Sequence, residues 1–291
     1  MKSKIYLISS MLIFGSIGLF VRGISISSSQ IALCRGIIGS VFLLSASILL
    51  KKKMSWKAIK PNFFLLLLSG TGIGFNWILL FEAYHYTSIA NATVSYYFAP
   101  VFVMFLSPFL LKEKLSPVKV ICILTAMIGM FFVVGAGEGG KLDNTNLIGI
   151  GYGLSAAVLY ASVVIMNKYM KGLTGLETTF VQISMASLTL LPYVLATQPF
   201  DYEVFQGTNI PLLLIVGLLH TGLAYLLYFT AIHQIEGQTV AVYSYIDPIS
   251  AILMSSIFFQ ETMGITQILG SVLILGATFW GEIYSVKLKK R

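Results

Sequence analysis

The sequence has few charged residues. Aspartate, glutamate, lysine and arginine together make up 10% of its 291 residues, whereas hydrophobic residues make up 57%. Soluble globular domains carry about 25% charged residues, which cover their surface. So few charges could not cover a large soluble core. The composition therefore excludes an ordinary soluble protein and favours a chain whose outer surface lies in lipid.

Cysteine and histidine are also scarce. The two cysteines, Cys34 and Cys122, lie in apolar runs, and the histidines are His85, His220 and His233. Two such cysteines provide neither a disulfide framework nor a metal cluster. We therefore expect no metal and no cofactor. An intramembrane enzyme is the weaker alternative, because the sequence offers no catalytic constellation.

The formal net charge of +8 could indicate binding to nucleic acid. However, the lysines and arginines lie in short segments between apolar runs, without a basic groove interleaved with aromatic residues. This placement is the usual topology signal of a membrane protein. We expect a lipid bilayer as the partner and no nucleic acid.

Hydrophobic residues are concentrated in ten long runs. A helix needs about 20 residues to cross the hydrocarbon core of a bilayer, and each run reaches or approaches that length. We therefore predict an all-α, polytopic membrane protein with ten transmembrane helices. The runs cover residues 5–21, 30–50, 62–81, 89–111, 118–135, 147–166, 177–195, 210–231, 239–259 and 265–285.

Positive charge is distributed unevenly between the segments that join these runs. If the N-terminus is cytoplasmic, the cytoplasmic segments contain 16 lysines and arginines, whereas the outer segments contain only Arg22 and Lys141. The positive-inside rule favours this orientation. We predict a multi-pass protein of the cell membrane with both termini in the cytoplasm, which requires an even number of spans.

The two halves of the chain resemble each other. A shift of 148 residues superimposes residues 74–113 on 222–261 without a gap, and ten of the forty positions are identical. The polar stretch 136–146 separates the halves, so we predict repeat domains at 1–138 and 139–291. The identical pairs include His85/His233, Tyr97/Tyr245, Pro100/Pro248 and Glu113/Glu261.

Each half contains five runs, and an odd number makes the second half insert upside down. The loop charges agree, because Lys112 and Lys114 correspond to the uncharged Gln260 and Thr262 on the opposite side. Inverted repeats with a site near the bilayer midplane are typical of secondary transporters, which work by alternating access. This repeat is the main reason to predict a transporter.

Short motifs in both halves also carry a family likeness. They are residues 81–83, 93–100 and 111–115 in the first half, and 229–231, 242–248 and Glu261 in the second. With these motifs the whole chain resembles the EamA-type branch of the drug/metabolite transporter superfamily. The resemblance implies a bundle of two inverted five-helix repeats around a central cavity, lined by helices 1, 3, 4, 6, 8 and 9. It also implies a relationship to amino-acid and metabolite exporters, although some relatives import.

Helical periodicity selects candidate substrate contacts. In the third run Asn76 lies on a stripe of small residues, and in the eighth run the equivalent stripe contains His220. Such a stripe serves either close helix packing or a wet cavity, and neither residue suits a lipid-facing position. The predicted substrate-binding residues are Asn76, Tyr97, His220, Tyr245, Phe14 and Tyr160.

Four ionisable residues lie within the runs or at their ends, namely Arg35, Glu82, His220 and Asp247. Charge inside a membrane is costly, so each is a candidate for proton coupling or gating. Histidine exchanges protons near neutral pH, although His220 could instead be a hydrogen-bonded core residue. We expect a structural ion pair between Arg35 and Glu82, with an outer gate as the alternative.

Prolines and glycines also interrupt the runs. Pro100 and Pro248 each remove a backbone hydrogen bond within a run, so we predict helix kinks there, either for packing or as hinges. The glycines of residues 70–74 and 149–153 lack the strand that a nucleotide-binding loop requires. We interpret them as sites of close helix packing.

Two function classes follow from these features besides an enzyme. A secondary transporter of small amphipathic metabolites would use a substrate or proton gradient, because the chain has no nucleotide-binding segment. Protons are then the candidate coupling ion, and an amino-acid exporter, an importer and an exchanger stay open. A passive channel would more often show a ring of charged residues, and no such pattern is present in the sequence.

Overall fold

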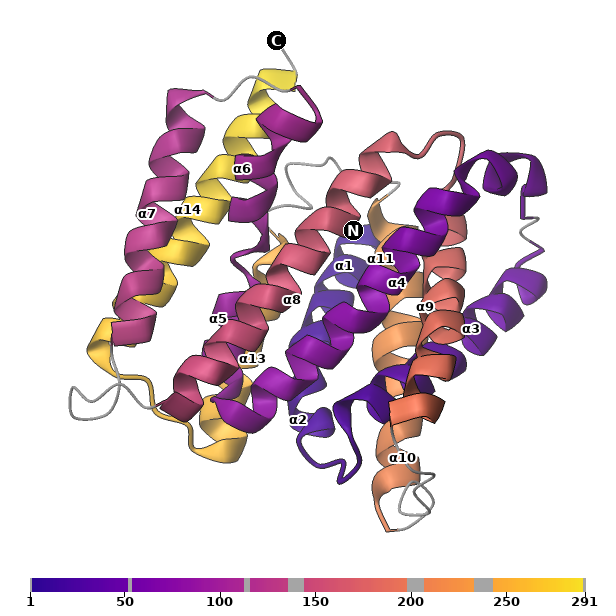
Figure 1. Cartoon of the computed structure of the whole chain (residues 1–291), viewed down its shortest axis with the longest axis horizontal. Coiled ribbons are helices and arrows are strands. Elements are labelled where there is room, and N and C mark those ends of the chain that lie inside the picture. The colour runs from indigo at the N-terminus through magenta and orange to yellow at the C-terminus, as the bar shows by residue number, and fades with distance from the viewer. Residues whose placement is uncertain are drawn as a thin grey trace.

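The computed structural model describes residues 2–51, 54–112, 116–135, 144–197, 207–232 and 243–289, and this part of the chain contains helices and no strand (Figure 1). The all-α prediction is therefore confirmed. The helices are α1 (Lys2–Gly15), α2 (Ile17–Val21), α3 (Ser28–Leu49), α4 (Trp56–Tyr86), α5 (Ile89–Tyr96), α6 (Ala99–Leu110), α7 (Pro117–Gly135), α8 (Asn144–Tyr169), α9 (Gly175–Thr197), α10 (Asn209–Leu214), the π-helical segment η3 (Ile215–Leu223), α11 (Ala224–Ile232), α13 (Ile246–Phe259) and α14 (Ile265–Lys289).

Seven helical segments in the described part are long and apolar enough to cross a membrane. They correspond to α1 with α2, α3, α4, α5 with α6, α8, α9, and α10 through α11. Shorter apolar helices cover Pro117–Val133, Ile246–Phe259 and Ile265–Gly281. The chain is therefore a multi-pass membrane protein, whereas the count of ten spans stays a prediction.

The outward-facing residues explain how the bundle suits lipid. Large apolar side chains are widely exposed, among them Phe131 at 73%, Ile257 at 72% and Phe258 at 69%. A soluble protein rarely exposes contiguous apolar surface of this extent. Polar side chains such as Arg35 and His220 are instead buried between helices. This inside-out distribution of polarity is what a bilayer requires.

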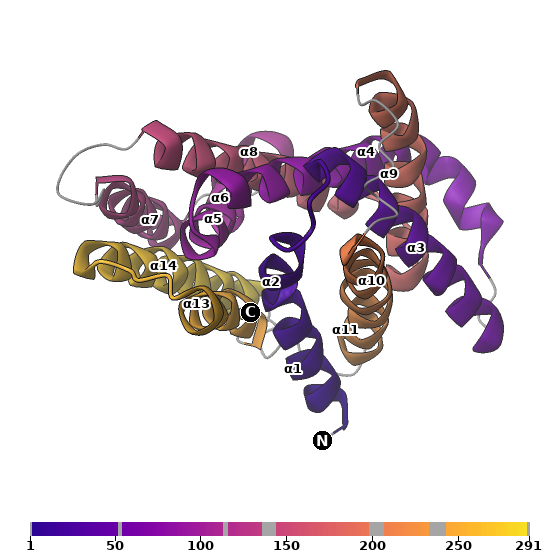
Figure 2. The same ribbon diagram turned by 90° about the horizontal axis from the view of Figure 1, so that it is seen from below.

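The helices pack in an irregular bundle (Figures 1 and 2). The long α4 lies along α8 and α9, and α3 lies along α9 and η3. At one edge, α7 and α14 run side by side. The main core cluster forms where α3, α4 and α9 meet, around Trp77, Phe81 and Leu190.

Two interruptions lie at positions that are equivalent in the repeat. The helix α5 ends at Tyr96, Tyr97 and Phe98 form a turn, and α6 begins at Ala99 with Pro100 in its first turn. After a shift of 148 residues, the equivalent turn is at Tyr245, just before α13. A proline suits the first turn of a helix, where its missing N–H leaves no bond unmade. Each run is therefore divided ahead of its proline.

The π-helical segment η3 interrupts a further span. His220 and Thr221 lie in it, and both side chains are fully buried. The hydroxyl of Thr221 donates to the carbonyl oxygen of Val216, five residues back, at 3.1 Å. Wide turns of this kind are frequent at functional sites. Here the segment brings two adjacent polar side chains into the bundle interior.

Most glycines of residues 70–74 and 149–153 permit close helix contacts, as the sequence predicted, whereas a Cβ atom on Gly151 would have no neighbour within 4 Å. A Cβ atom on Gly70 of α4 would lie 2.6 Å from the carbonyl oxygen of Gln182 in α9, and one on Gly149 of α8 would lie 2.7 Å from Thr87. The helices α7 and α14 approach just as closely, because a Cβ atom on Gly270 would lie 2.5 Å from the carbonyl oxygen of Gly129. Small residues allow this approach in membranes.

The substitution Gly270→Ala is therefore expected to destabilise the protein by about 1–3 kcal/mol, because the added methyl group would push α7 and α14 apart. Thermal unfolding in detergent measures the effect. Gly276→Ala is the matched control, since it lies in the same helix and a Cβ atom there has no neighbour within 4 Å. Equal melting temperatures for the two variants would contradict the close contact.

Candidate functional site

Arg35 lies at the centre of the candidate site. The helix α3 places it inside the bundle, where only 3% of its surface is exposed. Its guanidinium lies over the ring of Trp77 at 4.2 Å and over that of Phe81 at 5.4 Å. Its Nε donates a hydrogen bond to the hydroxyl of Thr221 at 3.0 Å. Aromatic faces and a hydroxyl group thus surround this positive charge.

The expected ion pair between Arg35 and Glu82 is wrong. The one ion pair among the described residues joins Arg22 to Glu261. The reason is helical phase, since neighbouring residues on a helix point about 100° apart. Because Phe81 faces Arg35, its neighbour Glu82 points elsewhere. A gating or coupling role for either residue stays a prediction.

Three tyrosines lie close enough to Arg35 to interact with its charge, namely Tyr84, Tyr96 and Tyr225. Tyr84 follows Phe81 by about one helical turn, and Tyr225 follows Thr221 in the same way, so each extends a face that already contacts Arg35. Sequence reasoning missed these three tyrosines. Helical spacing from Phe81 and Thr221 could have found two of them, but only once Arg35 was known to contact those residues.

Asp247 joins this group from the other half of the chain. The hydroxyl of Tyr97 donates to its Oδ2 at 2.6 Å. This bond links the turn between α5 and α6 to the first turn of α13. The interruption at Tyr245, two residues earlier, changes the helical phase at this position.

We call these residues the central cluster: Arg35, Tyr84, Tyr96, Tyr97, Tyr225 and Asp247. Both Arg35 and Asp247 interact electrostatically with Tyr84, Tyr96 and Tyr225. Four members, namely Tyr96, Tyr97, Tyr225 and Asp247, are only partly buried. A site for a small solute needs partly exposed polar groups that converge from several helices.

His220 lies beside Arg35's partner Thr221 and is fully buried. Its Nε2 lies 3.0 Å from the hydroxyl of Ser16, and its Nδ1 lies 3.3 Å from the carbonyl oxygen of Ile215. Its ring packs edge-on against Phe20 at 5.0 Å. The histidine therefore ties η3 to the junction of α1 and α2. These contacts agree with a hydrogen-bonded core residue, and a role in substrate binding or proton coupling stays a prediction.

Two other predicted substrate contacts connect helices. The side-chain amide of Asn76 donates to the carbonyl oxygen of Ala156 in α8 at 2.6 Å. The hydroxyl of Tyr245 donates to Thr278 at 2.8 Å, and its ring packs against Phe279 of α14. Tyr97 and Tyr245 are thus equivalent in the repeat but differ in use. Only Tyr97 belongs to the central cluster.

The predicted aromatic residues Phe14 and Tyr160 contact the cluster. Phe14 packs against Tyr225, with ring centroids 5.1 Å apart. Tyr160 packs against Tyr96 at 5.6 Å. Both therefore lie at the edge of the cluster, although Tyr160 is 42% exposed.

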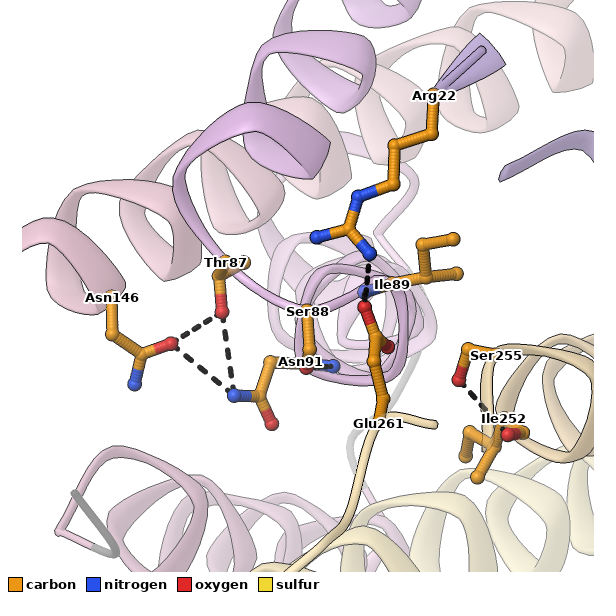
Figure 3. Close-up of polar contacts among 9 residues, drawn as sticks. All are labelled: Arg22, Thr87, Ser88, Ile89, Asn91, Asn146, Ile252, Ser255 and Glu261. Carbon is orange, nitrogen blue, oxygen red and sulfur yellow. Dashed lines mark hydrogen bonds and ion pairs between the residues drawn. The ribbon is translucent and has the colours of Figure 1, made fainter. Parts of the chain in front are cut away.

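A second polar site lies where α2 and α13 end and α5 begins (Figure 3). Arg22 forms an ion pair with Glu261 Oε1, and the same oxygen accepts a hydrogen bond from the backbone N–H of Ile89 at 3.2 Å. Arg22 also lies over the ring of Phe259 at 5.1 Å. We call Arg22, Ile89 and Glu261 the Glu261 latch. Sequence reasoning missed it and used Arg22 and Glu261 only for topology and the repeat.

The turn before α5 is anchored beside this latch. Asn146 at the start of α8 accepts hydrogen bonds from Thr87 and from the side-chain amide of Asn91 (Figure 3). The hydroxyl of Ser88 accepts from the N–H of Asn91 at 3.0 Å and so caps α5. The start of α5 is therefore held by Glu261 on one side and by Asn146 on the other.

Comparisons with known proteins agree on one family. A family model described as the EamA-like transporter family matches residues 1–135 and 147–280. The uncharacterized transporter YxxF of Bacillus subtilis (strain 168) is 29% identical over 272 residues, which cover 93% of this chain and 86% of that protein. The uncharacterized transporter YetK of the same organism is 25% identical over 252 residues, or 84% of this chain and 75% of that protein.

A solved structure shares the fold. It is titled "Crystal structure of protein", matches with a TM-score of 0.66 and covers 99% of this chain and 98% of its own. Its sequence identity is 16%. At this identity the likeness shows the fold alone.

Proposed function

Because the chain belongs to the EamA-like transporter family, we propose that it is a secondary transporter that exports amino acids or related small amphipathic metabolites by alternating access. One observation carries the proposal. The hydrogen bond between Tyr97 and Asp247 joins interrupted helices of the two halves beside a buried arginine. Discontinuous helices that meet at the repeat interface are typical of substrate sites in transporters.

The proposed topology has ten spans in two inverted five-helix repeats, with residues 1–138 and 139–291 as the repeat domains. The shorter helices α7, α13 and α14 would supply the three spans beyond the seven long ones. The positive-inside rule puts both termini in the cytoplasm. With that orientation the Glu261 latch lies at the outer surface, and the central cavity implied by the family would open at the central cluster.

The proposed mechanism assigns separate tasks to the two polar sites. The Glu261 latch ties α2 and the start of α5 to the end of α13, and so closes the outer side. Opening requires that both bonds to Glu261 break. The turns at Tyr97 and Tyr245 provide places where backbone angles can change without breaking a regular helix. Protons are the proposed coupling ion, carried by Asp247 or His220.

Transport in proteoliposomes tests this function. The purified protein is reconstituted with a pH-sensitive dye inside the vesicles, and a panel of amino acids, amines and sugars is supplied outside. We expect saturable, protein-dependent flux of at least one amino acid together with proton movement. Protein-free vesicles are the control. Flux that does not saturate, or that is absent for the whole panel, would contradict the proposal.

The repeat-equivalent tyrosines provide a matched pair of variants. Tyr97→Phe removes the hydroxyl bonded to Asp247. We expect the transport rate to fall by roughly tenfold or more, which corresponds to the free energy that a hydrogen bond to a charged group usually contributes. Tyr245→Phe removes the hydroxyl bonded to Thr278 and should lower the melting temperature with little effect on flux. Initial rates and thermal unfolding measure the two effects. Equal losses of flux would contradict the assignment of the site.

A further inference from the structure

The charge of Arg35 has no negative partner among the described residues. Its contacts there are the hydroxyl of Thr221 and the rings of Trp77 and Phe81. The ion pair that the structure does contain uses Arg22 instead. Burying a charge without an opposite charge costs free energy that rings and one hydroxyl recover only in part. The site therefore keeps a positive charge available.

The orientation of the guanidinium leaves the edge that carries its two terminal nitrogens without a hydrogen bond to the described residues. Its Nε–H group bonds to Thr221. The four N–H groups on its two terminal nitrogens make no hydrogen bond with the described residues. Trp77 and Phe81 pack on the guanidinium and Thr221 fixes one edge, so its plane is held in place. A planar fork of paired donors matches the two oxygens of a carboxylate.

The surroundings restrict which anion would fit. The neighbours Tyr84, Tyr96 and Tyr225 are neutral hydrogen-bonding groups, and Asp247 also interacts with them. One arginine balances a single negative charge. A phosphate dianion would leave an excess negative charge that the nearby aspartate repels. The aromatic rings around the cluster offer apolar surface for the rest of the solute.

We infer that Arg35 is the carboxylate-binding residue of the transport site, so that the substrates are small monocarboxylates with an apolar body. This inference rests on the proposed transport function and names its substrate class. An amino acid meets the requirement through its α-carboxylate. Its amide or its decarboxylated amine does not.

Trp77 provides a direct reporter, because its ring contacts the guanidinium. The chain has three tryptophans, and the other two, Trp56 and Trp280, are exposed at 75% and 60%. The variant Trp56→Phe/Trp280→Phe therefore leaves Trp77 as the single fluorophore of its kind. Fluorescence is titrated in detergent with leucine, leucinamide, 3-methylbutylamine, 4-methylpentanoate and inorganic phosphate.

We expect saturable fluorescence changes with leucine and 4-methylpentanoate. Leucinamide and 3-methylbutylamine should bind roughly tenfold more weakly or worse, because they lack the charge-assisted bonds, and phosphate should cause no change. Equal binding of leucine and leucinamide would overturn the inference. Binding of phosphate but not of the carboxylates would also overturn it.

Variants separate recognition from folding. Arg35→Gln should abolish the preference for leucine over leucinamide, and Arg35→Lys should reduce it, whereas Lys57→Gln, an exposed charge change in α4, should keep it. If Arg35→Gln does not fold, Thr221→Val keeps the arginine but frees its orientation, and should weaken leucine binding several-fold without changing leucinamide binding. A preference retained in every folded variant would refute the role of Arg35.

The inference and the proposed function fail in different ways. If proteoliposomes carry leucinamide as well as leucine, transport stands and the carboxylate site is refuted. If leucine binds at Trp77 with the expected preference but no solute crosses the membrane, the carboxylate site stands and the transport function fails.

Discussion

The substitution Asp247→Asn is expected to abolish proton movement coupled to transport. Asparagine keeps an oxygen that can accept the hydrogen bond from Tyr97, but it cannot bind and release a proton. The site should therefore keep its shape and lose its coupling. We expect proteoliposomes with this variant to exchange substrate across the membrane without acidifying or alkalising the interior.

Two comparisons make this result specific. Asp247→Glu keeps an ionisable carboxyl group and should retain part of the coupling. Glu177→Gln changes a carboxylate outside the central cluster, in the first turn of α9, that accepts hydrogen bonds from the backbone N–H groups of Ser55 and Thr174. It should therefore affect stability only. If Asp247→Asn still moves protons and His220→Gln does not, the histidine is the coupling group and the assignment to Asp247 is wrong.

Loss of the Glu261 latch is expected to open the outer side of the protein. Arg22→Gln removes the ion pair but leaves the bond between Glu261 and the N–H of Ile89. Glu261→Ala removes both contacts and should have the larger effect. A shift of about 1.4 kcal/mol in the balance of states changes the population of the open form roughly tenfold.

Cysteine labelling measures this opening. Thr93 lies one helical turn after Ile89 in α5, and only 5% of its surface is exposed. It can be replaced by cysteine in a Cys34→Ser/Cys122→Ser background. Its reaction with a membrane-impermeant maleimide added from outside should be roughly tenfold faster in Arg22→Gln, and faster still in Glu261→Ala. Lys57→Gln, an exposed charge change in the segment that starts α4, is the control. Equal labelling rates in all variants would show that the latch does not hold the outer side closed.

The limits of sequence reasoning are clearest at Arg35. Hydropathy identified it as a charge within a run, and the position of Glu82 near the same outer end of the next run suggested it as the partner. Depth along the membrane normal can be read from the sequence, but the direction in which a side chain points across the bundle cannot. The structure turns Phe81 rather than Glu82 toward Arg35.

The repeat has a similar limit. It paired Pro100 with Pro248, and the structure has an interruption just ahead of each proline, at Tyr97 and at Tyr245. It did not indicate that the two tyrosines differ in use. The hydroxyl of Tyr97 bonds to Asp247 in α13, whereas that of Tyr245 bonds to Thr278 in α14, because the two tyrosines pack against different helices.

The sequence by itself determined that this chain is helical, lies in a membrane and belongs to its family. Helix formation and membrane insertion follow from composition and from runs of apolar residues, and the family likeness follows from short motifs. All of these are local features of the chain. The tertiary structure alone decided which polar groups meet: Arg35 with Thr221, Tyr97 with Asp247, and Arg22 with Glu261. The physical reason is that such contacts depend on how each helix is rotated against its neighbours. A rotation of one residue, about 100°, exchanges one set of partners for another.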